Sequence, residues 1–218
     1  MDIIDNIDCF EIREPPRENP FTVTPTVYRD GRGLFAETWR RSSTDDGSWR
    51  VQENVSFSGH GVFRGMHAQS APHCQGKLVT CVFGEVVDFI VDARPDSSTF
   101  GAAFAVRLGQ SSMKSIWVPR GFLHGFHVTG EDGAVVSYAC DDAYHPECGI
   151  SVSPMSFLRA FSDSPDICGW CNRILGGGEP VMSNKDRDGV GFDAFVFDVN
   201  GKWMNDGVKW YADNDQRK

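Results

Sequence analysis

Several features that would point to large classes of partner are missing from this chain of 218 residues. It has no run of Lys or Arg, and 21 basic against 30 acidic side chains give it a net charge of −9. A nucleic-acid-binding face needs clustered cations to neutralise phosphates, so we expect no nucleic-acid partner. An anionic small molecule is not excluded in this way, because a few local cations are enough to hold it.

Long hydrophobic segments are also missing. No apolar run reaches the ~18 residues that a membrane helix needs. The first twenty residues carry acidic side chains throughout and lack the basic start and apolar centre of a secretory signal. We therefore expect a soluble, cytoplasmic protein with no membrane partner.

The cysteines do not form a recognisable framework. There are seven of them, an odd number scattered along the chain, which favours reduced thiols over disulfides. Cys168 and Cys171 form a single CxxC pair. A zinc site would need a second pair or histidines at ligand spacing, so this pair is weak support for metal or redox chemistry.

What the chain does contain is a series of short, strand-like segments separated by turn residues. The clearest is a predicted hairpin around Gly84, in which Val87, Phe89 and Val91 alternate with two aspartates. A second predicted hairpin joins residues 21–27 to residues 34–39 through a turn at 30–33. Further strands are expected at residues 3–4, 49–57, 61–69, 99–108, 115–119, 125–129 and 134–140.

This spacing, with no long helical pattern before residue 156, predicts an all-β sandwich or barrel. We place one domain at residues 20–188, preceded by a strand and connector (1–19) and followed by a tail without an assigned role (189–218). Short helical or irregular segments are expected toward the C-terminus, including residues 154–162.

One predicted strand has unusual chemistry. Within fifteen residues, the segment from 61 to 78 brings Arg64, His67, Gln69 and Lys77 between apolar neighbours. Charged and proton-handling side chains on a strand of this kind indicate the wall of a pocket rather than a solvated face.

A second motif, PxGxxHxF, spans residues 119–126 and delivers His124 from a Pro-Gly turn onto a strand. It resembles the second motif of cupins, which are double-stranded β-helices, also called jelly rolls. Metal-binding cupins carry an HxH pair in their first motif, whereas here His67 is followed by Ala68 and Gln69. A metal-dependent oxygenase or isomerase would have to use His60, His67, His73 and His124 at unusual spacing, so we expect no metal and no cofactor.

These motifs and several others together resemble the dTDP-4-dehydrorhamnose 3,5-epimerases, a family of metal-free cupins. The resemblance lies in residues 30–37, 51–56, 61–69, 75–79, 84–94, 119–126, 138–144 and 183–186, in order along most of the chain. It implies a cupin jelly roll and an isomerase that epimerises a nucleotide-linked 4-keto-6-deoxy sugar at C3 and C5. It also implies a homodimer built on the N-terminal strands, with the nucleotide site completed by the second subunit.

Epimerisation beside a ketone needs a base, a donor to the enolate oxygen and an acid on the opposite face. His67 is suited to be the base, Lys77 the enolate donor and Tyr138 the acid, since a phenol is protonated at neutral pH. The resemblance implies that Asp186 is the carboxylate that orients His67.

For the rest of the substrate, Arg32 and Arg64 have the fork geometry that suits a diphosphate. The resemblance assigns base and ribose contacts to Phe35, Glu37, Gln52 and Asn54, and substrate placement to Tyr144. Gln69, His124 and Lys185 are further candidates for the pocket, His124 as a residue that shapes it.

Two alternatives remain at this point: an epimerase acting at C3 only or C5 only on a related sugar, and a binding module without catalysis. Binding alone would need the arginines but neither His67 nor Tyr138. Ala68 departs from the family, which usually has an aromatic residue there, and we expect this change to remove a ring from the pocket wall.

Overall fold

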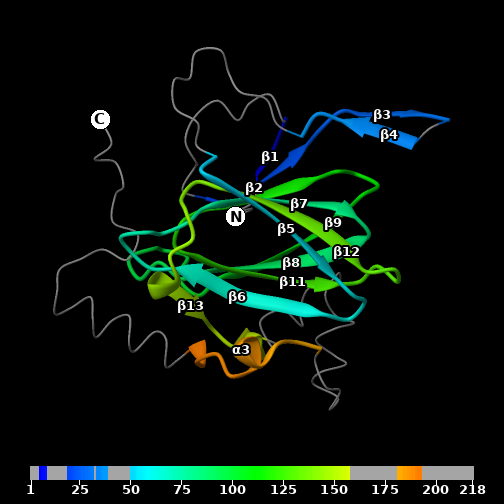
Figure 1. Cartoon of the computed structure of the whole chain (residues 1–218). Coiled ribbons are helices and arrows are strands. Elements are labelled where there is room, and N and C mark those ends of the chain that lie inside the picture. The colour runs from blue at the N-terminus through cyan, green and yellow to red at the C-terminus, as the bar shows by residue number, and fades with distance from the viewer. Residues whose placement is uncertain (1–4, 9–18, 32, 39–49, 158–180, 193–218) are drawn as a thin grey trace.

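The computed structural model describes residues 5–8, 19–31, 33–38, 50–157 and 181–192. Two sheets, antiparallel except for the parallel pair of β1 and β2, lie face to face and form the body of the molecule (Figure 1). The six-stranded sheet has the order β1-β2-β10-β7-β12-β5, and the five-stranded sheet the order β13-β6-β11-β8-β9. Chain-adjacent strands therefore lie in different sheets at several points, as in a jelly roll.

The strand bounds are as follows. The six-stranded sheet contains β1 (Asp5–Asp8), β2 (Phe21–Thr24), β10 (Ser115–Val118), β7 (Lys77–Phe83), β12 (Ala134–Cys140) and β5 (Gln52–Ser58). The five-stranded sheet contains β13 (Gly149–Ser151), β6 (Phe63–Gln69), β11 (Phe122–Val128), β8 (Glu85–Asp92) and β9 (Ala103–Gly109). The all-β jelly-roll prediction is confirmed, with short helical turns η2 (Pro146–Cys148), η3 (Pro154–Phe157) and α3 (Asn184–Arg187) late in the chain.

The predicted hairpin with a turn at residues 30–33 is confirmed, but its first strand was placed wrongly. Residues 21–27 do not form one strand, because the run is divided at Pro25, which cannot donate a backbone hydrogen bond to a ladder. The part before it, β2, pairs with β10 in the six-stranded sheet. The part after it, β3 (Val27–Asp30), pairs with β4 (Gly33–Ala36) in a separate two-stranded sheet that projects from the body (Figure 1).

The predicted hairpin around Gly84 was wrong, because the two strands that flank this glycine do not pair with each other. Glu85–Asp92 lies in the five-stranded sheet while Lys77–Phe83 lies in the other, so the chain crosses between sheets at this glycine. Gly84 has a φ of 73°, and a Cβ there would lie 2.0 Å from the carbonyl oxygen of Gly133. Only glycine fits this crossing.

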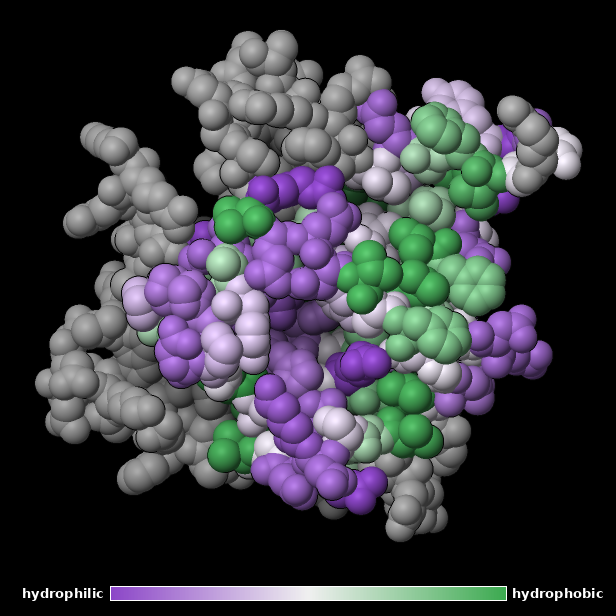
Figure 2. Space-filling view, viewed as in Figure 1, coloured by the Kyte–Doolittle hydropathy of each residue, from purple (hydrophilic) through white to green (hydrophobic). Residues whose placement is uncertain are grey.

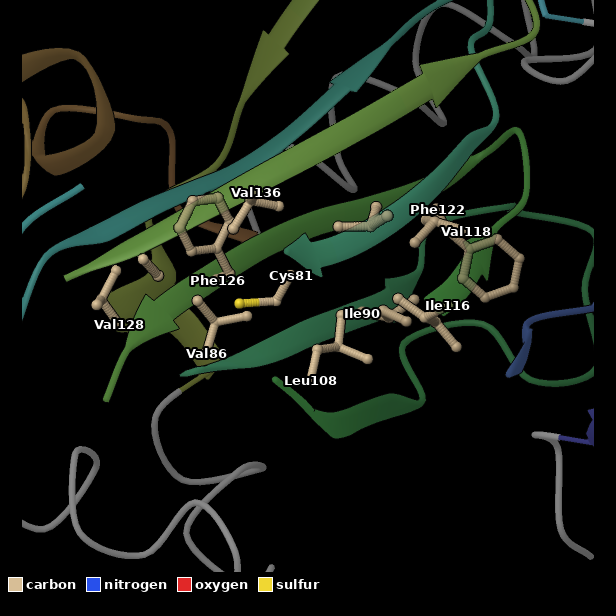
Figure 3. Close-up of a cluster of buried hydrophobic side chains, with 12 residues drawn as sticks. Cys81, Val86, Ile90, Leu108, Ile116, Val118, Phe122, Phe126, Val128 and Val136 are labelled. Carbon is tan, nitrogen blue, oxygen red and sulfur yellow. The ribbon is translucent and has the colours of Figure 1, made fainter. Parts of the chain in front are cut away.

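Two apolar layers follow from the alternation of side chains along the strands. Between the sheets lie Cys81, Val86, Ile90, Leu108, Ile116, Val118, Phe122, Phe126, Val128 and Val136, which Figure 3 shows interleaved from both sides. On the other face of the five-stranded sheet, Val87, Phe89 and Val91 pack with Phe157 and with the partly buried Phe192. The predicted alternation in β8 is thus confirmed, and both of its faces are covered.

The short turn η3, late in the chain, contributes Phe157 to the apolar layer on the outer face of the five-stranded sheet. The expected helix at residues 154–162 begins as the 3₁₀ turn η3, and residues 158–162 lie outside the described part, as do Cys168 and Cys171. The domain limits of 20–188 stay a prediction, although Val190 bridges to Val152 beyond them. Among the described residues, no helix is long and apolar enough to cross a membrane.

Candidate active site

His67 and Asp186 form the central pair of the site. His67 lies on β6, and its Nε2 is 2.6 Å from Oδ1 of Asp186 on α3. The imidazole is about one third exposed, whereas the carboxylate is almost buried. With Nε2 directed at the carboxylate, the other ring nitrogen, Nδ1, is left for a substrate.

Local structure explains how a residue 119 positions away reaches His67. The backbone N–H of Phe63, on the same strand, donates to the carbonyl of Val181 at 2.8 Å and docks the returning segment against the sheet edge. Ser183 then caps α3, its side chain accepting from the backbone N–H of Asp186. Burial alone would raise the pKa of Asp186, but the hydrogen bond and charge of His67, with a further bond from Ser183, outweigh it and hold that pKa below its usual range.

A second histidine–carboxylate pair lies beside the first. His124 on β11 is directly opposite His67 across the ladder, and its Nε2 is 2.8 Å from Oδ2 of Asp88 on β8. Both side chains are buried, and Oδ1 of Asp88 has no hydrogen-bond partner among the described residues. Burial raises the pKa of Asp88, although His124 and Lys77 oppose this effect.

The sequence interpretation included His124 and missed Asp88 as a functional residue. The available signal was an acid within the otherwise apolar run Val86–Ile90, in a strand covered on both faces. An unpaired carboxylate is too costly to bury at such a position, which indicates a partner and a chemical reason for its presence.

Tyr138 faces this pair from the opposite sheet. It lies on β12, and its ring meets that of His124 edge-on, with centroids 6.3 Å apart. Its hydroxyl is 2.9 Å from Oγ of Ser56 on β5. Burial raises the pKa of Tyr138 well above its usual value, so the phenol is a proton donor at neutral pH.

Lys77 begins β7, in the same sheet as Tyr138, and pairs in register with Cys140 and Val118. Burial lowers its pKa, and the nearby charges of Cys140, Asp88 and Asp141 only partly compensate. The structure therefore places Lys77 and Tyr138 on one sheet and His67, His124 and Asp88 on the other, with the interior between them.

Arg64 lies near the opening of this interior. Its Nε donates to Oγ of Ser58 at 2.7 Å and its terminal nitrogen to the carbonyl of Phe57 at 3.3 Å, both on β5. Figure 2 shows a hollow with a hydrophilic floor between the two sheets. Hydrophobic side chains surround one side of it, over β5 and toward β3 and β4 (Figures 1 and 2).

Four other predicted residues come together at the neighbouring loops. Oε1 of Gln52 accepts from the backbone N–H of Tyr144 at 2.8 Å, and Nε2 of Gln52 donates to Asn54. The buried Gln69 donates from Nε2 to the carbonyls of His73 and Ala143. Gln69 thus uses its amide to fix loops, while the side chain of Tyr144 is half exposed.

The remaining candidates lie apart from this group. Phe35 is on β4 in the projecting hairpin, about two thirds exposed, and its nearest recorded ring neighbour is Tyr28. Glu37 follows the same strand. Lys185 is exposed on α3, and Arg32 lies outside the described residues.

The expectation for Ala68 was wrong. Ala68 is buried among Met66, Phe89 and Leu123 in the apolar layer on the outer face of the five-stranded sheet. Its neighbour His67 points elsewhere, to Asp186, because consecutive strand residues face opposite sides. Residue 68 therefore contributes no wall to the space between the sheets.

Known proteins with similar sequences and folds identify the family of this chain. The family profile described as dTDP-4-dehydrorhamnose 3,5-epimerase matches residues 17–193. The chain belongs to the dTDP-4-dehydrorhamnose 3,5-epimerase family. This family membership confirms the resemblance on which the assignment of Asp186 rested.

Relatives agree with the family profile. The dTDP-4-dehydrorhamnose 3,5-epimerase of Shigella flexneri is 42% identical over 180 residues, covering 79% of this chain and 91% of that protein. The enzyme of that name from Neisseria gonorrhoeae is 46% identical over 127 residues, but the match spans 56% of this chain and only 38% of that protein.

A solved structure extends the likeness to the fold. The dTDP-6-deoxy-D-glucose-3,5-epimerase of Legionella pneumophila, determined in complex with dTDP-4-keto-L-rhamnose, has a TM-score of 0.65 at 32% identity. The match covers 80% of this chain and 90% of that structure. The epimerase family therefore accounts for both the sequence and the arrangement of the sheets.

Proposed function

We propose that this chain is an isomerase that epimerises a dTDP-linked 4-keto-6-deoxy sugar, converting dTDP-4-dehydro-6-deoxyglucose to dTDP-4-dehydrorhamnose by inversion at C3 and C5. The observation that carries the proposal is the placement of two proton-handling groups, His67 on β6 and Tyr138 on β12, in the two facing sheets, with His124 opposite His67 on the ladder and its ring against that of Tyr138. Inversion requires removal and return of a proton on opposite faces of the sugar, which this placement provides.

In this mechanism His67 removes the proton next to the ketone. Asp186 stays ionised because its pKa is lowered, so it holds the ring and stabilises the imidazolium that forms. Lys77 donates to the enolate oxygen, where one oriented donor contributes about 3 kcal/mol in the transition state. Tyr138 returns a proton from the other face. His67 then releases its proton to solvent and Tyr138 regains one from solvent, so that the second carbon can pass through the same cycle.

The nucleotide end uses Arg64 for the diphosphate, together with the group of Gln52, Asn54 and Tyr144. The other candidates, Arg32, Phe35 and Glu37, belong in the sequence to the segment of the β3–β4 hairpin, which forms a two-stranded sheet separate from the two large sheets and projects from the body (Figure 1). We therefore propose a homodimer in which the β3–β4 hairpin reaches the partner's site. The exposed Val55, Phe57 and Phe35 support this contact surface.

We also propose a cytoplasmic location. Cys81, Cys140 and Cys148 are buried thiols, which is the form expected in a reducing compartment.

The test of the reaction is solvent exchange. The protein and dTDP-4-dehydro-6-deoxyglucose are combined in D₂O, and NMR follows deuterium at C3 and C5 together with the inverted product. Deuterium at both carbons supports the proposal, deuterium at one carbon shows a mono-epimerase, and none at either leaves a binding module.

The base is tested with His67→Ala against the control His60→Ala, which alters an exposed histidine of the β5–β6 turn. The first variant should lose exchange at both carbons while the control keeps it. Near-normal exchange in His67→Ala would remove His67 from the role of base.

A further inference from the structure

A group of metal-ligating side chains lies outside the proposed reaction. His73, in the loop between β6 and β7, meets Asp142 and His145, in the loop after β12. One donor atom from each of the three residues lies within 4.8 Å of the other two. We propose that these residues form a binding site for a divalent transition-metal ion such as Zn²⁺, distinct from the groups that move protons.

The side-chain amides of Gln69 and Gln75 hold in place the two loops that carry the donors. Gln69 donates to the carbonyl of His73 at 2.9 Å, and its Oε1 accepts from the backbone N–H of His145 at 2.6 Å. Gln75 donates to the carbonyl of Asp142 at 2.7 Å. Each of the three residues is thus fixed at its backbone, and a site of this kind needs only side-chain adjustment to bind.

The donor set has the chemistry of a three-ligand zinc site with open positions. Two imidazoles and a carboxylate suit Zn²⁺, Co²⁺, Ni²⁺ and Cu²⁺ better than Ca²⁺ or Mg²⁺, which prefer oxygen ligands alone. The side chains of His73 and His145 are 35% and 31% exposed, so an ion and its waters have a route in from solvent.

A further carboxylate supports the ligand role of His145. Nδ1 of His145 is 3.1 Å from Oε1 of Glu147. A histidine that binds a metal usually gives its second ring nitrogen to a carboxylate, which fixes the tautomer and makes the first nitrogen a better ligand. In this arrangement Nε2 of His145 is the atom that faces the ion.

Binding requires one local movement. The rings of His73 and His145 are stacked, with centroids 3.5 Å apart and an interplanar angle of 10°. The nitrogen lone pairs lie in the ring planes, and the planes of two stacked rings do not meet, so one ring must rotate before both nitrogens reach an ion at ~2.0–2.1 Å. Nδ1 of His73 and Oδ2 of Asp142 are already 3.7 Å apart, close to the ~3.4 Å between two ligands of a tetrahedral ion.

The site has a consequence for the loop between its ligands. Tyr144 stands between Asp142 and His145, and a bound ion would fix this short segment at both ends. The three ligands lie in loops, whereas His67, Lys77 and Tyr138 lie on strands, so the ion would act on loop order rather than on proton transfer.

The experiment is a titration of the untagged, metal-stripped protein with Zn²⁺ by calorimetry, with Co²⁺ absorption and Cu²⁺ electron paramagnetic resonance as spectroscopic readouts. We expect about one ion per chain and coupling of Cu²⁺ to two nitrogens. Asp142→Asn, which keeps an acceptor for the backbone N–H of Ala143, and His145→Gln should each weaken binding at least ~10-fold.

His60→Ala serves as the matched control, and circular dichroism shows that each variant is folded. Loss of binding confined to the two ligand variants supports the site. Unchanged binding in both folded variants, an equal loss in His60→Ala, or no saturation below millimolar Zn²⁺ would overturn it. The readout is binding alone, so the result does not depend on the proposed epimerisation.

Discussion

At the scale of single residues, two histidines of the five-stranded sheet, the partly exposed His67 and the buried His124, are each paired with a carboxylate in a different environment. Asp186 gains from its partners and has a lowered pKa, whereas burial dominates at Asp88 and raises its pKa. Two similar pairs, His67 with Asp186 and His124 with Asp88, are thereby given different electrostatic states. Different pKa values allow two groups of the same kind to take the separate roles of acid and base.

Tyr138→Phe tests the division between base and acid. The variant keeps His67 and Asp186, so the proton next to the ketone should still leave and be replaced by deuterium from the same face. Inversion should fall on the order of 100-fold or more because the opposite donor is missing. NMR of the product in D₂O measures both quantities, and inversion at the normal rate would exclude Tyr138 as the acid.

Asp88→Asn tests the cost of the buried carboxylate. Because the pKa of Asp88 is raised, the folded state binds the proton more tightly than the unfolded state, and the ionised group lowers stability as pH rises through the folded pKa. The amide should therefore keep or increase the melting temperature at neutral pH while turnover falls at least ~10-fold.

Calorimetric melting and steady-state kinetics of Asp88→Asn provide the two measurements. A large drop in melting temperature would show that Asp88 is mainly a structural partner of His124. Unchanged turnover would show that the reaction does not use its charge.

At the scale of elements, much of the sheet structure was predictable because strand alternation and turn residues are local signals. The alternation of Val87, Phe89 and Val91 predicts β8, and all three pack on one face. The turn at residues 30–33 was also predicted correctly, but the first strand of that hairpin was placed wrongly because Pro25 divides two strands that belong to different sheets. The predicted pairing across Gly84 was wrong, because β7 and β8 lie in different sheets. Sheet membership depends on distant partners, which alternation alone does not encode.

The turn after β8 offers a stability test. Oδ2 of Asp92 accepts from Arg94, Ser97 and Thr99, and the guanidinium of Arg94 lies over the ring of Phe122. Burial would raise the pKa of Asp92, but these hydrogen bonds outweigh it and lower that pKa. Asp92→Ala should lower the free energy of unfolding by about 3–5 kcal/mol at neutral pH, since it leaves the partners of a buried charge unpaired.

The effect of Asp92→Ala should depend on pH in a defined direction. A carboxylate whose pKa is lowered in the folded state stabilises the protein at pH values above its unfolded pKa of about 3.9. This contribution disappears as pH falls through the folded pKa. Urea unfolding at neutral pH and near ~3 should therefore show a smaller difference from the parent protein in acid. The exposed Asp96→Ala in the same turn is the control, and an equal loss in both variants would contradict the argument.

At the scale of the whole molecule, the described chain exposes apolar side chains beside the hollow. Val55 and Phe57 on β5 are 67% and 62% exposed, and Tyr28 and Phe35 on the projecting hairpin are similarly open. The position of this hairpin away from the body was not predictable from residues 30–37, whose sequence indicates a turn and not its direction. The family resemblance predicted a site that includes Phe35, Gln52 and Asn54, and the fold places Phe35 on a two-stranded sheet separate from the one that carries the other two.

Phe57→Glu tests the proposed dimer. A charge at this exposed apolar position should prevent burial against a second subunit and shift the protein to a monomer in analytical ultracentrifugation. If the partner's hairpin completes the nucleotide site, KM should also rise on the order of 10-fold with a smaller change in kcat. If the dimer persists unchanged, the contact between the subunits must lie on another surface.

The separation of His67 and Asp186 in the sequence also has a consequence for the order in which the chain is synthesised. β13, the last described strand of either sheet, ends at Ser151, whereas the carboxylate that pairs with His67 is supplied by residue 186. Every described strand of both sheets is therefore synthesised before His67 gains this partner. If His67 is the base that we propose, a chain that has grown only as far as residue 151 contains the strands of the scaffold without the group that would make proton abstraction possible.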